Sequence, residues 1–147
     1  MRDVLLFIHI VGVAGWLGGG LYSVYAYSTV AGLEPAAAGA AVEALQKRDD
    51  RFFGPTSGLV VLSGIGLVLT SEAYGWGDTF VLIGLGAFVL SGILNGIVGK
   101  KNNARLVKAS TSGSGMAEAL GSWRRGTAWD FMILFIVIWA MITKIGA

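Results

Sequence analysis

The chain has 147 residues, of which 54% are hydrophobic and 14% are charged, whereas ordinary soluble domains carry about 25% charged residues. This composition predicts one domain that resides in a lipid bilayer. The chain contains no cysteine, which excludes disulfides, thiolate metal sites, iron–sulfur clusters and cysteine nucleophiles.

Four apolar segments, each bounded by charged residues, predict transmembrane helices at residues 4–30, 52–71, 79–99 and 127–145. A bilayer core of about 30 Å requires about 20 helical residues at 1.5 Å each. The first segment is longer than the apolar region of a cleaved signal peptide, so we expect it to be retained. The predicted fold is all-α, a single four-helix transmembrane bundle covering residues 1–147.

The connections between the segments predict the orientation. Residues 31–51 and 100–126 hold nine of the eleven lysines and arginines, so the positive-inside tendency makes both of them cytoplasmic loops and both termini extracytoplasmic. The first loop begins with Pro35 and is rich in alanine, which favours a helix leading into the second span. The second contains the flexible stretch STSGSG. Its basic residues are suited to membrane lipid or to setting the topology, and no nucleic acid is expected.

The 23 glycines predict close helix packing. In lipid, small residues let helix backbones approach and increase dispersion contact. The small-xxx-small spacing occurs at Gly15 and Gly19, Gly54 and Gly58, and Gly92 and Gly96. We expect a tight bundle, with a glycine-rich face left over for a homodimer. The stretch GSGMAEALG lacks the preceding strand of a phosphate-binding loop, so no nucleotide is expected.

The only histidine, His9, lies inside the first apolar segment. At 100° per residue, it shares one helix face with small, polar and ring side chains, and this face should point into the bundle: Gly12, Trp16, Gly20, Ser23 and Tyr27. An imidazole in hydrocarbon must be hydrogen-bonded or bound to a ligand. One prediction is therefore a neutral His9 that bonds across the helices to Asn95, Ser63 or Ser91.

The other prediction is that His9 is a metal ligand. A single histidine cannot form a closed zinc site, but haem needs only one or two axial bonds. The small faces of Gly12, Gly19 and Gly20 leave room for a flat macrocycle against Trp16 and Tyr22. A second axial ligand should come from the same leaflet, and the candidates are Met141, Lys144 or His9 of a second copy.

The first span has the pattern His-x6-Trp-x2-Gly, formed by His9, Trp16 and Gly19 and followed by Tyr22. It resembles the first helix of small bacterial membrane families, which include the copper-resistance D domains, an uncharacterised family of predicted integral membrane proteins, and the HemJ-type protoporphyrinogen oxidases. The next segment is similar to the second helix of that group through Pro55, Ser63 and Gly64. The likeness covers the first half of the chain.

The resemblance to HemJ-type proteins implies b-type haem, held by the histidine of the first helix and by a lysine of a later helix. Here Lys100, Lys101, Lys108 and Lys144 lie at span ends or in loops, so the oxidase activity does not follow. The resemblance to copper-resistance D domains implies metal uptake. Copper(I) sites, however, favour soft sulfur ligands, and the four methionines of this chain are dispersed along it.

We therefore expect a multi-pass protein of the bacterial inner membrane that binds haem b or a related porphyrin through His9. The alternatives are a copper or small-solute permease and a non-catalytic assembly protein, and the sequence leaves open whether the chain is an enzyme. The acidic residue nearest to the interior of a span is Asp130, for which we expect a capping or interfacial role, neutralised by Arg124 or Arg125, rather than proton transfer.

Overall fold

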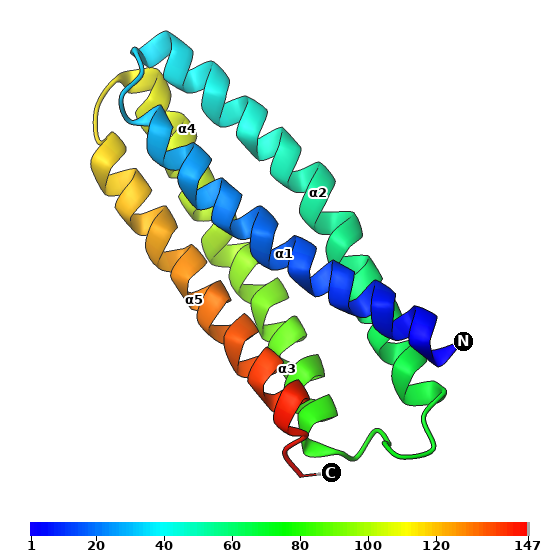
Figure 1. Cartoon of the computed structure of the whole chain (residues 1–147). Helices are drawn as coiled ribbons and strands as arrows, with labels where there is room; N and C mark the ends of the chain where they lie inside the picture. Colours follow the sequence, from blue (N-terminus) through cyan, green and yellow to red (C-terminus); the bar gives the residue numbers. More distant parts are fainter. Residues whose placement is uncertain (147) are drawn as a thin grey trace.

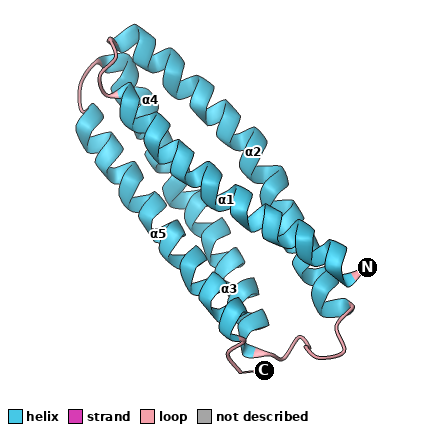
Figure 2. Cartoon of the chain, in the orientation of Figure 1, coloured by secondary structure: helices cyan, strands magenta, loops and turns pink. Residues whose placement is uncertain are grey.

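The computed structural model describes residues 1–146, which form four long helical rods and no strand (Figures 1 and 2). Each rod is long and apolar enough to cross a membrane, so the prediction of an all-α chain with four such helices is confirmed. One rod consists of three successive elements, α3, the π-helical turn η1, and α4. The bounds are α1 (Arg2–Val30), α2 (Pro35–Leu69), α3 (Thr79–Leu94), η1 (Asn95–Gly99), α4 (Lys100–Ser112) and α5 (Met116–Thr143).

Most of the residues expected in the two long loops are helical. Helix α2 starts at Pro35, the first helical position, where its missing N–H costs no hydrogen bond. The third rod continues through α4 to Ser112, and α5 begins only a few residues later, at Met116. The turn between them needs left-handed backbone at Gly113 and Gly115, with φ of 69° and 74°, which glycine adopts without strain. The STSGSG stretch is thus a helix end followed by a tight turn.

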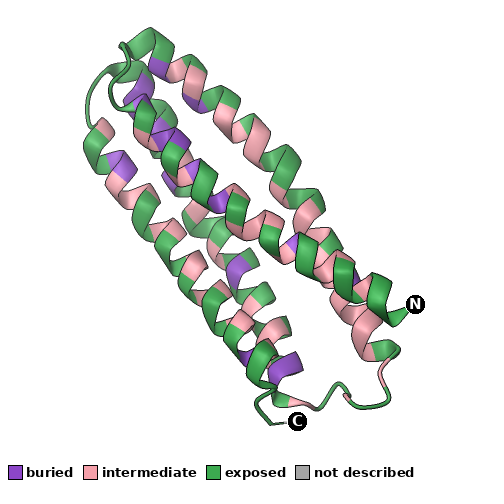
Figure 3. Ribbon diagram, in the orientation of Figure 1, coloured by how far each residue is buried: buried purple, intermediate pink, exposed green. Residues whose placement is uncertain are grey.

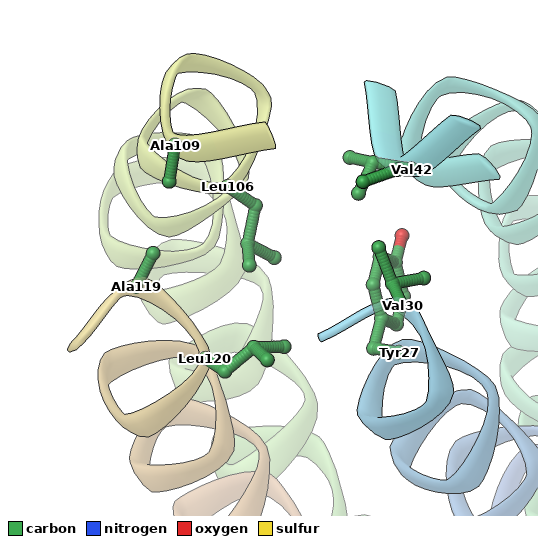
Figure 4. Packing of buried hydrophobic residues seen from close by; sticks show 8 residues of the cluster. Tyr27, Val30, Val42, Leu106, Ala109, Ala119 and Leu120 are labelled. Atoms are coloured by element: carbon green, nitrogen blue, oxygen red, sulfur yellow. The ribbon is translucent and has the colours of Figure 1, made fainter. Parts of the chain in front are cut away.

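The end of the bundle that holds these two turns has a continuous apolar core, and we call it the closed end. Side chains from α4 and α5 point toward those of α1 and α2 (Figure 4). Val42 and Leu106 are 0% exposed and Tyr27 is 1% exposed. Buried residues gather here (Figure 3). The helical extensions form because their apolar residues find partners in this core.

Toward the chain termini and the connection 70–78, which we call the open end, the rods separate into two pairs (Figure 1). Helix α1 packs on α2, and α3 packs on α5, whereas in the described residues the backbone of α3 does not come close to α1 or α2, nor that of α2 to α5. Side chains still bridge the two pairs, because Val68 of α2 packs against residues of α3 and α5. A small cluster of Phe80, Val81 and Ala140 holds the second pair together. Large apolar side chains such as Leu62 and Ile142 point outward here, as expected for helices surrounded by lipid.

The glycines divide into two groups. A Cβ added at Gly12 would lie 2.8 Å from Cγ2 of Val60, and one at Gly20 would lie 2.9 Å from the ring of Phe131. These glycines therefore allow close contacts of α1 with α2 and with α5. By contrast, an added Cβ would have no neighbour within 4 Å at four glycines of the predicted pairs, namely Gly54, Gly58, Gly92 and Gly96. Spacing alone did not reveal which glycines the fold uses.

Candidate functional site

His9 lies between α1 and α2, with its ring against the backbone of α2. Its Nδ1 is 2.9 Å from the carbonyl oxygen of Val60 and 3.2 Å from Oγ of Ser63. Gly64 makes room for the ring, because a Cβ there would lie 3.2 Å from Cε1 of His9. Of the three partners expected from the sequence, Ser63 is the one that bonds to the imidazole.

The hydrogen bond to Val60 fixes the tautomer of the ring. A carbonyl oxygen can only accept, so Nδ1 carries the proton and donates it. The hydroxyl of Ser63 donates its own proton to backbone carbonyls of α2, including that of Val60 at 3.1 Å, and therefore also faces Nδ1 as an acceptor. Nε2 is left with a lone pair, for which residues 1–146 supply no hydrogen-bond partner.

This arrangement serves two purposes at once. The hydrogen bonds from Nδ1 join α1 to α2. They also give one of the two ring nitrogens a hydrogen-bond partner in an apolar setting. A backbone carbonyl on Nδ1 also orients a histidine so that Nε2 is the free ligand atom, which is the usual geometry of metal-bound histidines. The tautomer set by Val60 thus leaves the lone pair on Nε2 and not on Nδ1.

The other site residues predicted on α1 do not line an open space for a cofactor. The space beside Gly12 is filled by Val60, and the space beside Gly19 is filled by the ring of Phe52. A macrocycle therefore has no room on this face of α1 while α2 is packed against it. Trp16 is half-buried, and Tyr22 is exposed, with the guanidinium of Arg48 4.4 Å from its ring centroid.

The candidates for a second axial ligand lie with other partners. Met141 packs beside Gly84 of α3, in the cluster of Phe80, Val81 and Ala140. Lys144 donates to the hydroxyl of Tyr74 and so ties the end of α5 to the connection 70–78. The structure thus places His9 against α2, whereas Met141 and Lys144 lie on the α3–α5 side.

No group of three or more histidine, cysteine, aspartate or glutamate side chains that could hold a metal ion occurs in the described part of the chain. His9 is also the only histidine. A metal bound to Nε2 would have to bring most of its ligands with it, which is the property of a metalloporphyrin.

A second polar centre lies between α3 and α5. Oγ of Ser91 donates to Oδ1 of Asp130 at 2.9 Å, and Nδ2 of Asn95 donates to the carbonyl oxygen and Oγ of Ser91 at 3.1 and 3.3 Å. Asn95, expected to bond to another helix, bonds to Ser91 of its own rod and also lies within hydrogen-bonding reach of Asp130 on α5. Neither Arg124 nor Arg125 forms an ion pair with Asp130. The ion pair found among the described residues joins Arg48 to Asp49.

That ion pair belongs to a polar layer between α1 and α2 that the sequence analysis missed. Arg48 donates to Oγ of Ser23 at 2.6 Å, and Ser23 donates to Oδ1 of Asp49 at 3.0 Å. The available signal was the serine on the His9 face of α1. Asp3 and Ser23 are 20 positions apart, which is about 30 Å of helix and the thickness of a bilayer core.

Comparison of the chain with protein-family models, with curated proteins and with solved structures finds no match. The family resemblance of the first half therefore remains a prediction.

Proposed function

We propose that this chain is a membrane protein that binds b-type haem or a related porphyrin through Nε2 of His9, for redox or tetrapyrrole chemistry. The observation that carries the proposal is the 2.9 Å hydrogen bond from Nδ1 of His9 to the carbonyl oxygen of Val60. It holds the ring in the tautomer whose Nε2 can bind iron. Bound haem would supply one-electron chemistry.

The roles of the neighbouring residues follow from their contacts. Val60 and Ser63 orient the imidazole and fix its tautomer. Gly64 leaves the space that the ring needs against α2. These three residues would keep the axial ligand in place, as outer-shell partners of metal-bound histidines do.

The apolar surface that suits a porphyrin lies on α5 rather than beside Gly12 and Gly19. A shallow, largely open groove on the outer face of α5 is lined by apolar side chains, namely Ala128, Phe131, Met132, Phe135, Ile136 and Trp139. It starts where Phe131 meets Gly20 of α1. His9 is seven positions from Arg2, and Ile136 is seven positions from Thr143. Both residues therefore lie about 10 Å along their helices from the open end.

The absorption spectrum of the gently purified protein tests the proposal. We expect a Soret band that is lost in His9→Ala after haem is supplied. Ser63→Ala removes one orienting partner but keeps the ligand atom, so it should weaken the band without abolishing it. Circular dichroism and thermal unfolding of both variants would show whether the loss reflects the ligand or the fold.

The alternatives predict other outcomes of the same experiment. A wild-type protein with no Soret band after haem is supplied contradicts the proposal. If His9→Ala then lowers thermal stability, the imidazole serves only to join α1 to α2. If cells that produce the protein accumulate copper or another solute, a permease is the better description.

We also propose the orientation in the membrane. Nine of the eleven basic residues lie in the closed-end half, at residues 47–51, 100–108 and 124–125, so the closed end should face the cytoplasm and both termini the outside of the bacterial inner membrane. Because the chain has no cysteine, single-cysteine variants test this cleanly. An impermeant maleimide added to intact cells should label Gly75→Cys and spare Ser114→Cys, and the reverse pattern would contradict the orientation.

Lipid and a second copy of the chain are the partners that we propose. Outward-facing apolar side chains cover the open half of the rods, as lipid contact requires. Gly54, Gly58, Gly92 and Gly96 meet no side chain of their own chain, so they are the glycine-rich faces left for a homodimer. Loss of a chemically cross-linked dimer in Gly92→Leu/Gly96→Leu would support the third rod as the interface, and an unchanged dimer would exclude it.

A further inference from the structure

The Asp130 carboxyl group lies within α5, in the first turn of the predicted fourth membrane span. It is five positions beyond Arg125, and its partner Ser91 is nine positions before Lys100. At 1.5 Å per residue, these positions are about 8 and 14 Å from the charged residues at the closed end. Ionisable side chains are costly at such depth, and they mark functional sites by default.

The hydrogen bonds around Asp130 all run toward the carboxyl group. Asn95 donates to Ser91, and Ser91 donates to Oδ1 of Asp130. Asn95 begins the π-helical turn η1, a type of irregularity often found at functional sites. Asn95 also lies within hydrogen-bonding reach of the Asp130 carboxyl group, and Oδ1 accepts from Ser91, so a proton can bind to Oδ2 or leave it while Oδ1 keeps its bond to Ser91.

No ion pair joins this carboxyl group to a helix that packs on α5, within the described residues. Helix α3 and η1 contain no titratable residue, the titratable residue of α1 that packs against α5 is Tyr27, and the cations of α4 are Lys100, Lys101, Arg105 and Lys108. The basic residues nearest along the chain, Arg124, Arg125 and Lys100, form no ion pair with Asp130. An ionised Asp130 would be uncompensated in an apolar interface, which is strongly unfavourable.

The surroundings of Asp130 favour a proton over a metal cation. Hard cations such as Ca²⁺ and Mg²⁺ require about six oxygen ligands, whereas Asn95 directs its N–H groups, not its oxygen, at Ser91. A proton needs only one oxygen lone pair.

The two directions away from Asp130 differ in polarity. Toward the closed end, Gly126 lies beside Asn102, which accepts from Oγ of Ser122 at 2.8 Å, and Arg105 donates to the same hydroxyl at 3.4 Å. Toward the open end, the α3–α5 interface is apolar, with Phe80, Val81 and Ala140 buried and Met141 against Gly84. The polar side chains nearest to Asp130 along these helices thus lie toward the closed end, which is the side from which we infer that its proton is exchanged.

We propose that Asp130 is a proton-binding site within the α3–α5 pair that exchanges its proton with the closed end of the bundle. This role differs from the capping role expected from the sequence. It rests on other residues than the proposed haem ligation, because the ligand atom belongs to His9 on the α1–α2 pair. A proton-binding carboxyl group open to one side of a membrane is what a proton-coupled reaction or transport step requires.

Labelling with dicyclohexylcarbodiimide tests the proposal, since this apolar reagent adds to protonated carboxyl groups. The full-length protein is reconstituted in sealed vesicles, the pH of each side is clamped separately, and the peptide that carries Asp130 is analysed by mass spectrometry. Labelling should follow the closed-end pH, falling about tenfold per pH unit above the midpoint, as for a single proton. It should not respond to the open-end pH.

Two variants and one internal control make the result interpretable. Asp130→Asn should lose the label while its helical content is unchanged, because an amide can still accept from Ser91. In Ser91→Ala, labelling should extend about one pH unit higher, because the ionised form loses its donor. Asp3, which is exposed at the open end, reports on reagent access. Absence of label on Asp130 between about pH 5 and about pH 9, labelling that follows the open-end pH, or an unchanged midpoint in Ser91→Ala would overturn the proposal.

Discussion

At the closed end, Val42 and Leu106 are 0% exposed, whereas at the open end Leu69 and Ile142 are 68% and 72% exposed. The closed end has the construction of a small water-soluble bundle, in which side chains of α1, α2, α4 and α5 meet in one apolar core (Figure 4). The open half has two helix pairs joined by small residues and by a few buried polar groups. Its large apolar side chains face outward.

The difference follows from the solvent that each half is suited to. In water, burial of apolar surface is the main favourable contribution to folding. In lipid, apolar side chains gain little by leaving the acyl chains, so dispersion contacts at glycines and interhelical hydrogen bonds hold the helices together. The chain therefore changes its mode of packing along its length, near the layer of Ser23, Arg48 and Asp49.

The difference in packing between the two halves is tested most strongly by shortening one leucine in each half. Leu106→Ala removes a side chain that is 0% exposed in the closed-end core, and it should lower the unfolding free energy by about 2–5 kcal/mol. Leu62→Ala, at a position that is 70% exposed, should change it by less than about 0.5 kcal/mol. Reversible unfolding in detergent measures both variants. Equal losses would show that the two halves are packed by the same principle.

A smaller effect is expected from adding a methyl group at the helix contacts of the open half. In Gly12→Ala the new Cβ would lie 2.8 Å from Cγ2 of Val60, and the overpacking should cost about 1–3 kcal/mol. Gly18→Ala is the matched control, because its Cβ would meet nothing within 4 Å and alanine favours helix by up to about 1 kcal/mol.

The same unfolding measurement separates the two glycine variants. Val60→Ala should restore part of the stability lost in Gly12→Ala, because it removes the clashing methyl group. If Gly12→Ala is as stable as Gly18→Ala, close packing of α1 on α2 at Gly12 does not hold the open half together.

The two polar centres of the open half differ in a comparable way. The imidazole of His9 is held by a backbone carbonyl, which leaves one nitrogen available to a ligand. The carboxyl group of Asp130 is held by a serine hydroxyl, which leaves one oxygen available to a proton. His9 lies on the α1–α2 pair and Asp130 on the α3–α5 pair.

The sequence was sufficient to predict the four long apolar helices, because their length and hydropathy are local properties. It also placed His9 on a face shared with small and polar residues and named Ser63 among its partners. It did not predict the bond to Val60, since the carbonyl groups of a helix are usually occupied within that helix. The helical form of α4 was missed because its support comes from Leu106 and Ala109, which pack against distant segments.

By itself, then, the sequence determined the four long apolar helical segments and the positions along them of the single histidine and of Asp130. The tertiary structure decided which faces meet. It filled the spaces beside Gly12 and Gly19 with Val60 and Phe52, and it gave Asp130 a serine in place of an arginine. The physical reason is that helix periodicity defines directions around one axis, whereas contacts depend on the position of a second helix.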